Sequence, residues 1–327
     1  MAEYEGRSIL VLGGSSGIGL EAVAEFKRLG ADHVYVGTSN PAHYEDALTK
    51  TLQRRKKLDT STGIHPFVAD VTDKMQLATA ALAIKRSGVE LTDVIFSQAG
   101  GMEGFTEKLF SRHIDPIVDD YTLNTPMDEL KPEEQMIVKE RLTAMRTDLE
   151  VWTDNALPRA IYVNCMGTFN ALAVLGETFS NGFRGIFYNS TWGHLSGQDG
   201  VEIPLLYRPV DRSKALVRDR LELEGQYLAE TGIPMGVVVA SLVKDTKVGK
   251  MFNDFLLNLM SKEQREAIVN SSIYARDVVR ATREMLESSP KEGLSYPQIS
   301  FVYGRNGQAV VEDHLEMSAM YTIPYLF

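Results

Sequence analysis

The segment Ser8-Ile-Leu-Val-Leu-Gly-Gly-Ser-Ser-Gly-Ile-Gly19 constrains the fold of this chain more than any other. Its apolar start, residues 9–12, predicts a buried strand, and residues 20–29 carry apolar side chains at helical spacing. A glycine-rich turn between a strand and a helix leaves backbone N–H groups free at the positive end of the helix dipole. The segment therefore predicts an anion-binding turn, and an ordinary strand-to-helix turn is the alternative.

Each glycine of this turn suits the binding of a dinucleotide. Gly13 can take the tight turn, Gly17 leaves room for a pyrophosphate, and Gly19 lets the helix pack closely on the strand. Because the predicted strand and helix flank these glycines in the required order, we favour the dinucleotide-binding interpretation.

Further strands and helices alternate along the chain. Strands are predicted at 9–12, 33–36, 64–69, 91–97, 185–189, 235–240 and 298–302. This alternation predicts an α/β fold, a Rossmann-type doubly wound parallel sheet of about seven strands with helices on both faces. We expect one domain over residues 1–327, with an insertion at 104–147 after the fourth strand and a C-terminal extension at 289–327 that contains the last strand.

The insertion is rich in prolines and charged residues. Residues 132–146 predict a separate surface helix, and a second helix is expected from about 149 to 179, bent at Pro158. Because the insertion follows the fourth strand, it lies at the carboxyl edge of the sheet, where ligands bind in such folds. We expect part of it to be a lid over a substrate pocket.

Composition excludes several classes of partner. The net charge of −10 argues against nucleic acid as a partner, because binding by counterion release needs clustered Lys and Arg. No apolar run approaches the ~18 residues of a membrane span, so no membrane partner is expected. The single cysteine, Cys165, excludes an intrachain disulfide and fits a reducing compartment, which predicts a cytoplasmic protein.

Six segments carry a family resemblance, in the same order along the chain as in the family. They are Leu12-Gly-Gly-Ser-Ser-Gly-Ile-Gly19, Asp70-Val71, Gln98-Ala-Gly100, Asn164 in Val163-Asn-Cys-Met-Gly-Thr-Phe169, Ser190, and Ser213-Lys214-Ala215-Leu216. Together they resemble the short-chain dehydrogenase/reductase superfamily, over most of the chain except the insertion and the C-terminal tail. The resemblance implies a nicotinamide dinucleotide cofactor and a dimer or tetramer of identical chains.

The resemblance also implies which residues bind this cofactor. Asp70 would contact the adenine ring, and Lys214 would hold the ribose. The full set is Gly13, Ser15, Ser16, Gly17, Ile18, Gly19, Asp70, Val71, Gln98, Ala99, Gly100 and Lys214. The second strand ends in Thr38, Ser39 and Asn40, without the carboxylate that would repel a ribose 2′-phosphate. These three residues therefore join the set, and we expect NADP(H) to be preferred over NAD(H).

The substrate side departs from the family pattern. The family's catalytic tyrosine stands four residues before the lysine, where this chain has Val210. The interval from Ser190 to Lys214 is also longer than usual, and Ala240-Ser241 replaces the usual Pro-Gly after the sixth strand. The dinucleotide-binding half is therefore expected to be kept and the chemical half to be altered.

The resemblance assigns catalytic roles to Asn164, Ser190 and Lys214. Ser190 would bind a substrate oxygen, and Asn164 would keep the long helix open for a water molecule. Val210 has no proton to donate, so another residue must supply it. The candidates are His194, Tyr207, Asp211, His113 and Tyr121. His194 is best placed to titrate near neutral pH, Tyr207 is the nearest tyrosine, and Asp211 is more simply a helix N-terminal residue.

These observations predict an NADPH-dependent oxidoreductase with an atypical active site. Its substrate would be a medium-sized, largely apolar carbonyl or imine compound, for example an intermediate of natural-product biosynthesis. An iminium substrate would need no proton donor at all. A cyclase, isomerase or dehydratase of the same fold, or a dinucleotide sensor without catalysis, are the alternatives. No metal site is expected, because the six histidines are scattered.

Overall fold

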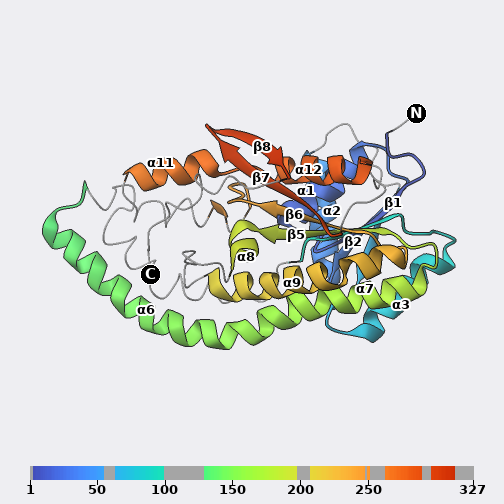
Figure 1. Cartoon of the computed structure of the whole chain (residues 1–327), viewed down its shortest axis with the longest axis horizontal. Helices are drawn as coiled ribbons and strands as arrows, with labels where there is room; N and C mark the ends of the chain where they lie inside the picture. Colours follow the sequence, from blue (N-terminus) through green and yellow to red (C-terminus); the bar gives the residue numbers. More distant parts are fainter. Residues whose placement is uncertain are drawn as a thin grey trace.

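The computed structural model describes residues 3–54, 63–98, 129–196, 207–246, 249–250, 262–288 and 296–313. Within these ranges the strands form one eight-stranded sheet with the order β3-β2-β1-β4-β5-β6-β7-β8 (Figure 1). The strands are β1 Ser8–Leu12, β2 His33–Thr38, β3 Ile64–Val68, β4 Asp93–Phe96, β5 Arg184–Ser190, β6 Met235–Ala240, β7 Gln298–Arg305 and β8 Gln308–Glu312. The first seven are parallel, which confirms the predicted Rossmann-type doubly wound sheet.

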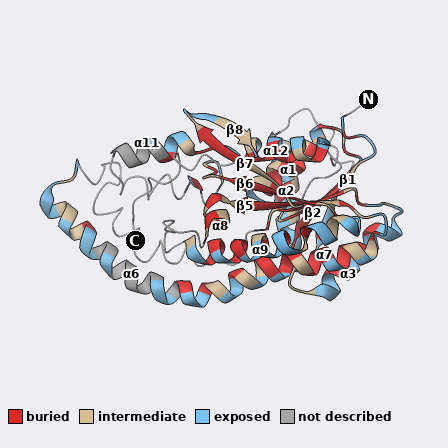
Figure 2. Cartoon of the chain, viewed as in Figure 1, coloured by how far each residue is buried: buried red, intermediate tan, exposed pale blue. Residues whose placement is uncertain are grey.

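Helices cover both faces of the sheet. Their bounds are α1 Gly17–Arg28, α2 Pro41–Arg54, α3 Lys74–Arg86, α6 Pro132–Ala160, the π-helix η2 Ile161–Met166, α7 Gly167–Thr178, α8 Thr191–Leu195, α9 Arg208–Glu230, α11 Lys262–Ser271 and α12 Ala275–Glu287. The strands between them are largely buried, while the outer faces of the helices are exposed (Figure 2).

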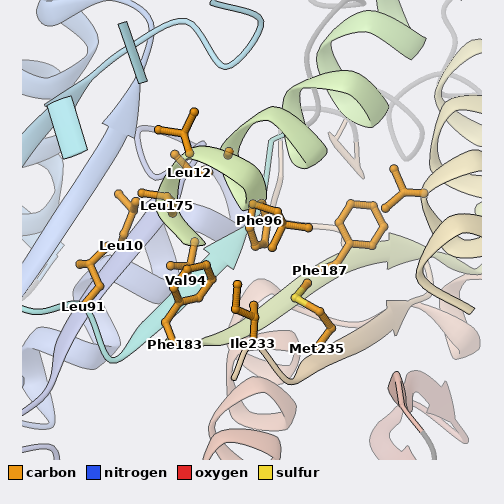
Figure 3. Packing of buried hydrophobic residues seen from close by; sticks show 14 of the residues in the cluster. Leu10, Leu12, Leu91, Val94, Phe96, Leu175, Phe183, Phe187, Ile233 and Met235 are labelled. Atoms are coloured by element: carbon orange, nitrogen blue, oxygen red, sulfur yellow. The ribbon is translucent and has the colours of Figure 1, made fainter. Parts of the chain in front are cut away.

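Two hydrophobic cores, one on each face, hold these layers together. Successive strand residues point to opposite faces, so Leu10 and Leu12 join the core under α3, α7 and α9, whereas Ile9 and Val11 join the core under α1 and α12. Phe96, Phe187 and Met235 fill the centre of the first core (Figure 3). Each large side chain buried in this way contributes about 1.5–3 kcal/mol to folding.

The eighth strand was not predicted and runs antiparallel to β7. The two strands are joined by Asn306 and Gly307, whose φ angles are 54° and 76°. Asn-Gly with both residues at positive φ is a favoured two-residue hairpin turn, because its twist matches that of the flanking strands. This dipeptide was the sequence signal for the additional strand.

The helix predicted at 132–146 is not separate from the one after it. α6 runs without interruption from Pro132 to Ala160 and continues through η2 into α7, so the prediction of two helices was wrong. No glycine or proline lies between residues 133 and 157 to end the helix. α6 lies beside α9 and extends past the end of the sheet (Figure 1).

Other parts of the sequence-based predictions fall partly outside the described ranges. Of the insertion predicted at 104–147 the structure describes 129–147, and of the extension at 289–327 it describes 296–313. None of the helices described is long and apolar enough to cross a membrane.

Candidate active site

The glycine turn has the geometry predicted for it. Gly13 has a φ of 78°, which disfavours any other residue, and its N–H donates to the Gly37 carbonyl of β2 at 3.0 Å. A Cβ atom on Gly19 would lie 2.3 Å from the Gly13 carbonyl oxygen, so only glycine lets α1 approach the turn this closely. The roles predicted for Gly13 and Gly19 in shaping the turn are confirmed.

The first turn of α1 fits an anion. Ser16 occupies the N-cap position without a side-chain hydrogen bond to the helix, and the first turn contains no acidic residue. Ser16 and Gly17 are exposed, while Ser15 and Ile18 are half-buried. The first-turn N–H groups are therefore not capped by a side chain, as binding of a pyrophosphate requires.

Thr246 is a further candidate on this side of the site that the sequence analysis did not identify. Its Cγ2 lies 3.8 Å from the position of a Cβ on Gly17, and its hydroxyl donates to the Val243 carbonyl at 2.8 Å. The loop after β6 thus reaches the glycine turn. The sequence signal that could have identified Thr246 is its position in the loop after the sixth strand.

The residues expected around the adenosine lie at the ends of β2 and β3. Thr38 is buried, whereas Ser39 and Asn40 are exposed. Asn40 Oδ1 accepts a hydrogen bond from the Ala42 N–H at 3.0 Å, which caps α2. Of the three groups predicted near a 2′-phosphate, the Ser39 hydroxyl is therefore exposed and the Asn40 side chain is exposed with its Oδ1 used in the cap.

Asp70 and Val71 follow β3. The Asp70 Oδ1 atom accepts hydrogen bonds from the N–H and hydroxyl of Thr72 at 2.9 and 2.8 Å, so the carboxylate is held in place. Val71 packs so closely on Gly167 that a Cβ there would lie 2.6 Å from its Cγ2. This contact joins the predicted adenine-binding segment to the start of α7.

A buried chain of hydrogen bonds crosses the centre of the site. Gln98 Nε2 donates to the Thr168 hydroxyl at 2.8 Å, and that hydroxyl donates to the Asn164 carbonyl at 2.6 Å. The Asn164 side-chain amide donates to Ser213 Oγ at 2.9 Å, and Ser213 donates to the Val210 carbonyl at 2.8 Å. The chain connects the end of β4 to the first turn of α9. Ala99 and Gly100, also predicted to bind the cofactor, lie outside the described residues.

Asn164 lies in the π-helix η2. A π-helix widens the helix by one residue per turn, and such turns occur frequently at functional sites. The expectation that the long helix opens at Asn164 is confirmed by this geometry. The water molecule implied by the resemblance remains a prediction.

Ser190 and Tyr207 are brought together at the carboxyl end of β5. Ser190 ends the strand, and its hydroxyl accepts a hydrogen bond from the Gly193 N–H at 3.1 Å. Tyr207, the N-cap residue of α9, lies near enough for the Ser190 hydroxyl to influence its pKa. Burial raises the pKa of Tyr207 above its ordinary value of 10.0, and the Ser190 hydroxyl offsets part of that rise. Tyr207 therefore stays protonated at neutral pH.

Helical spacing places Tyr207 on the same face of α9 as the predicted lysine. Positions separated by four and seven residues share a helix face, so Tyr207, Asp211 and Lys214 form one line along α9. The edge of the Trp192 indole packs against Tyr207, with ring centroids 4.9 Å apart. Val210, at the position of the family's tyrosine, is 7% exposed.

Lys214 is buried and its ammonium group faces β5. Lys214 Nζ donates to the Tyr188 carbonyl at 2.5 Å and lies 5.2 Å from the centre of the Phe187 ring. Burial lowers the pKa of Lys214 to about 8, so the side chain is still mostly charged at pH 7. The role predicted for it at the ribose is not addressed by these contacts.

His194 does not titrate near neutral pH, contrary to the sequence-based expectation. Its ring packs edge-on against Phe301 of β7 at 5.0 Å between centroids, and its Nδ1 atom is buried without a partner in the described structure. Burial, assisted by the nearby Arg218 charge, lowers the pKa of His194 to about 4. The segment 191–195 forms the short helix α8, and this helix turns His194 toward β7.

Asp211 is a titratable group that lies close to Tyr207 in the site. It lies in the first turn of α9, as predicted, but its Oδ2 atom accepts a hydrogen bond from Ser196 at 2.7 Å. Burial raises the pKa of Asp211 to about 7. His113 and Tyr121, the candidates from the insertion, lie outside the described residues.

The sheet order and the glycine turn define a Rossmann-type α/β protein with a dinucleotide-type turn. The family model described as short chain dehydrogenase matches residues 7–119, which include the turn and the segment after β4. Over residues 7–119 the chain is thus similar to short-chain dehydrogenases, and solved structures of that family share its fold. No curated protein matches it.

Several solved structures share its fold. A short-chain dehydrogenase from Burkholderia cenocepacia in complex with NADP is 19% identical, with a TM-score of 0.53 over 88% of this chain and 86% of the other. Actinorhodin polyketide ketoreductase with NADPH is 17% identical, with a TM-score of 0.60 over 94% and 99%. A short-chain dehydrogenase/reductase from Mycobacterium ulcerans is 16% identical, with a TM-score of 0.59 over 88% and 85%.

Proposed function

We propose that the protein is an NADPH-dependent reductase of a medium-sized, largely apolar carbonyl or imine substrate. The observation that carries this proposal is the proximity of the Ser190 and Tyr207 hydroxyls at the carboxyl end of β5. In an open α/β sheet ligands bind at this edge. Two hydroxyls held together there can bind one substrate oxygen and supply its proton.

The cofactor-binding half supports the same function. The uncapped first turn of α1 and the close approach at Gly19 fit a pyrophosphate. The short-chain dehydrogenase of Burkholderia cenocepacia and actinorhodin polyketide ketoreductase, which share this fold, were solved with NADP and NADPH. The lack of a carboxylate in Thr38, Ser39 and Asn40 favours NADP(H) here over NAD(H).

Each residue of the chemical half has a defined task in this proposal. When bound, a reduced nicotinamide dinucleotide supplies a hydride. Ser190 binds the substrate oxygen and Tyr207 gives that oxygen its proton. Trp192 packs on Tyr207 and restricts its ring. The hydrogen bonds of Asn164 and Ser213 hold the first turn of α9, which carries Tyr207 at its start.

Tyr207 thus takes over the task of the family's tyrosine from a position three residues earlier. The shift keeps it on the helix face of Lys214, two turns away in place of one. Lys214 Nζ lies against β5, and the pKa of Tyr207 is raised above 10.0. Tyr207 is therefore expected to act as an acid that starts protonated and to lack a nearby cation that would stabilise its anion.

The test is NADPH oxidation by the whole chain with a panel of ketones and cyclic imines. We expect Tyr207→Phe to lower ketone reduction by ~10²–10⁴-fold, the usual contribution of a proton donor, with NADPH affinity unchanged. Tyr227→Phe, at an exposed tyrosine of the same helix, is the matched control.

The other outcomes separate the remaining functions. Reduction of preformed iminium ions but not of ketones, unaffected by Tyr207→Phe, would favour hydride transfer without a proton donor. NADPH binding without turnover of any substrate would contradict the reductase and favour a non-redox enzyme or a sensor.

A further inference from the structure

A buried carboxyl group lies one helical turn after Tyr207. Asp211 is 2% exposed, and its Oδ2 atom accepts the hydrogen bond from Ser196 at 2.7 Å. Its Oδ1 atom is buried without a hydrogen-bond partner in the described part of the chain. Burying a charged carboxylate with one oxygen unsatisfied is costly, so this arrangement needs an explanation.

Capping of α9 does not explain Asp211. A carboxylate that caps a helix accepts hydrogen bonds from backbone N–H groups of the first turn. Among the described residues the hydrogen bond to Asp211 comes from a side chain, that of Ser196, which follows α8. The carboxyl group is therefore turned toward the end of α8, and its charge influences Tyr207, one helical turn earlier.

We propose that Asp211 stores the proton that resupplies Tyr207 after each reduction. This inference rests on the proposed function. Asp211 does not contact the substrate in this scheme and acts through Tyr207, so it is a positioning residue for proton delivery. Asp211 is thus the group that gives Tyr207 a proton. Lys214, two turns along α9 from Tyr207, cannot do this while its Nζ is hydrogen-bonded to the Tyr188 carbonyl.

The surrounding charges are compatible with a carboxyl group that holds a proton at neutral pH. Burial raises its pKa to about 7, against the lowering effects of the Ser196 hydrogen bond and of Arg212, Arg218 and Arg208 on α9. From α8, His194 contributes no charge at pH 7, because its own pKa lies at about 4. The charge of Asp211 in turn raises the pKa of Tyr207, so the two groups are coupled.

The proton balance of the step is as follows. When bound, a reduced nicotinamide dinucleotide would supply a hydride, with its two electrons, to the carbonyl carbon, and the carbonyl oxygen would take the proton as the Tyr207 O–H bond breaks. The Tyr207 oxygen then takes the proton of the Asp211 carboxyl group, which is the stronger acid. The Asp211 carboxylate regains a proton from water, and the half-buried Ser196, whose hydroxyl is hydrogen-bonded to it, can pass that proton on.

The pH dependence of kcat tests the proposal. In the wild type we expect kcat for ketone reduction to fall as pH rises through about 7, because the unprotonated form of Asp211 cannot resupply Tyr207. Asp211→Asn keeps the shape and the contact with Ser196 but has no acidic proton. It should lower kcat by about 10-fold or more and remove this pH dependence, with KM and NADPH affinity little changed. Asp211→Glu should recover part of kcat together with the pH dependence.

Glu224→Gln, at a half-exposed carboxylate of the same helix that pairs with Arg220, is the matched control and should behave like the wild type. A profile in Asp211→Asn with the same descending limb as the wild type would overturn the proposal. So would a loss of activity in Asp211→Asn that Asp211→Glu does not reverse.

A second measurement does not depend on turnover. Carbon NMR of the protein labelled at the aspartate carboxyl carbons, with Asp211→Asn assigning the resonance, reports the protonation of Asp211 directly. We expect it to titrate near 7 and to shift when Tyr207 is replaced by Phe. Titration at the ordinary value of 3.8 would overturn the proposal, with or without turnover. A wild type that binds NADPH and reduces nothing would instead refute the reductase function alone.

Discussion

The side-chain amide of Asn164 donates a hydrogen bond to the hydroxyl of Ser213 at 2.9 Å, and both groups are buried. This contact joins the π-helix η2 to the first turns of α9, one residue before Lys214. It thereby ties the widened helix turn to the helix that carries Tyr207 at its start.

Loss of this hydrogen bond should affect stability and catalysis together. Asn164→Ala leaves the buried Ser213 hydroxyl without its donor, which costs about 1–3 kcal/mol of the free energy of unfolding. Urea denaturation followed by circular dichroism measures this cost. We also expect a lower kcat, because the first turn of α9 is held less rigidly.

Asn155→Ala removes an exposed asparagine of α6 and serves as the control, for which we expect a change within about 0.5 kcal/mol. Equal stability losses in the two variants would show that the buried contact has no special role.

The glycine turn provides a prediction for cofactor binding. In Gly19→Val the new Cβ would lie 2.3 Å from the Gly13 carbonyl oxygen, so α1 must move away from the turn. We expect NADPH binding to be lost in a chain that still folds, measured by fluorescence titration.

Gly88→Ala is the matched control, because it replaces a glycine of positive φ with open space around it. It should cost about 1 kcal/mol of stability without changing NADPH affinity. NADPH affinity unchanged in Gly19→Val would contradict the assignment of the dinucleotide site.

A buried ion pair at the opposite edge of the sheet is expected to contribute to stability alone. Asp93 is fully buried, with Oδ1 at 2.7 Å from an Arg7 nitrogen and 3.3 Å from Nε of Arg184. Asp93→Asn leaves two guanidinium groups without their buried partner, which should cost about 3–5 kcal/mol of the free energy of unfolding.

The control is Asp219→Asn, which removes a half-exposed partner of Arg218 and should cost about 0–1 kcal/mol. NADPH affinity should be the same in folded Asp93→Asn as in the wild type. A cost for Asp93→Asn no larger than the control would show that burial does not strengthen this ion pair.

Lys214 provides a pH dependence of cofactor binding. If its ammonium group holds the cofactor ribose, NADPH affinity should weaken as pH rises through about 8, where the buried side chain loses its charge. Lys214→Met should lower the affinity by about 10- to 100-fold and remove this pH dependence, since hydrogen bonds to charged groups contribute about 1.5–3 kcal/mol. The measurement is the NADPH dissociation constant across this pH range.

Lys139→Met, at an exposed position of α6, controls for the loss of a positive charge. An affinity in Lys214→Met that equals that of the wild type would leave Lys214 with the structural contact to Tyr188 as its function.

The cofactor-binding half was largely predictable from the sequence because its signals are local. A strand, a glycine turn and a helix are adjacent in the chain, and the φ of Gly13 follows from the turn itself. The special place of Asn164 in the long helix was also predictable, through its family motif.

The chemical half depends on contacts that the sequence does not show. His194 was expected to titrate near neutral pH, but its ring packs against Phe301, from the far end of the chain, and burial lowers its pKa. The proximity of Tyr207 to Ser190 and the burial of Asp211 depend on how α8 packs against α9. The residues that this packing brings together show no periodic pattern in the sequence.

Positions 207 and 210 are the two places on α9 where a tyrosine could act as the proton donor, and they can be compared directly. Val210, where the family has its tyrosine, is 7% exposed, and its carbonyl accepts the hydrogen bond of Ser213. A tyrosine ring at this buried position overpacks the first turn, so Val210→Tyr should destabilise the fold by about 1–3 kcal/mol. Because Tyr207 already contacts Ser190, we expect no gain in ketone reduction.

The double variant Tyr207→Phe with Val210→Tyr decides between the two positions. We expect it to be as slow as Tyr207→Phe alone, because residue 207 is the one near Ser190 and the longer segment between Ser190 and Lys214 has moved the donor along the helix. The measurement is kcat/KM for one ketone in the wild type, both single variants and the double variant, each at a temperature where it is folded. Recovery of ketone reduction in the double variant would show that position 210 still faces the substrate, and it would refute the assignment of Tyr207 as a relocated donor.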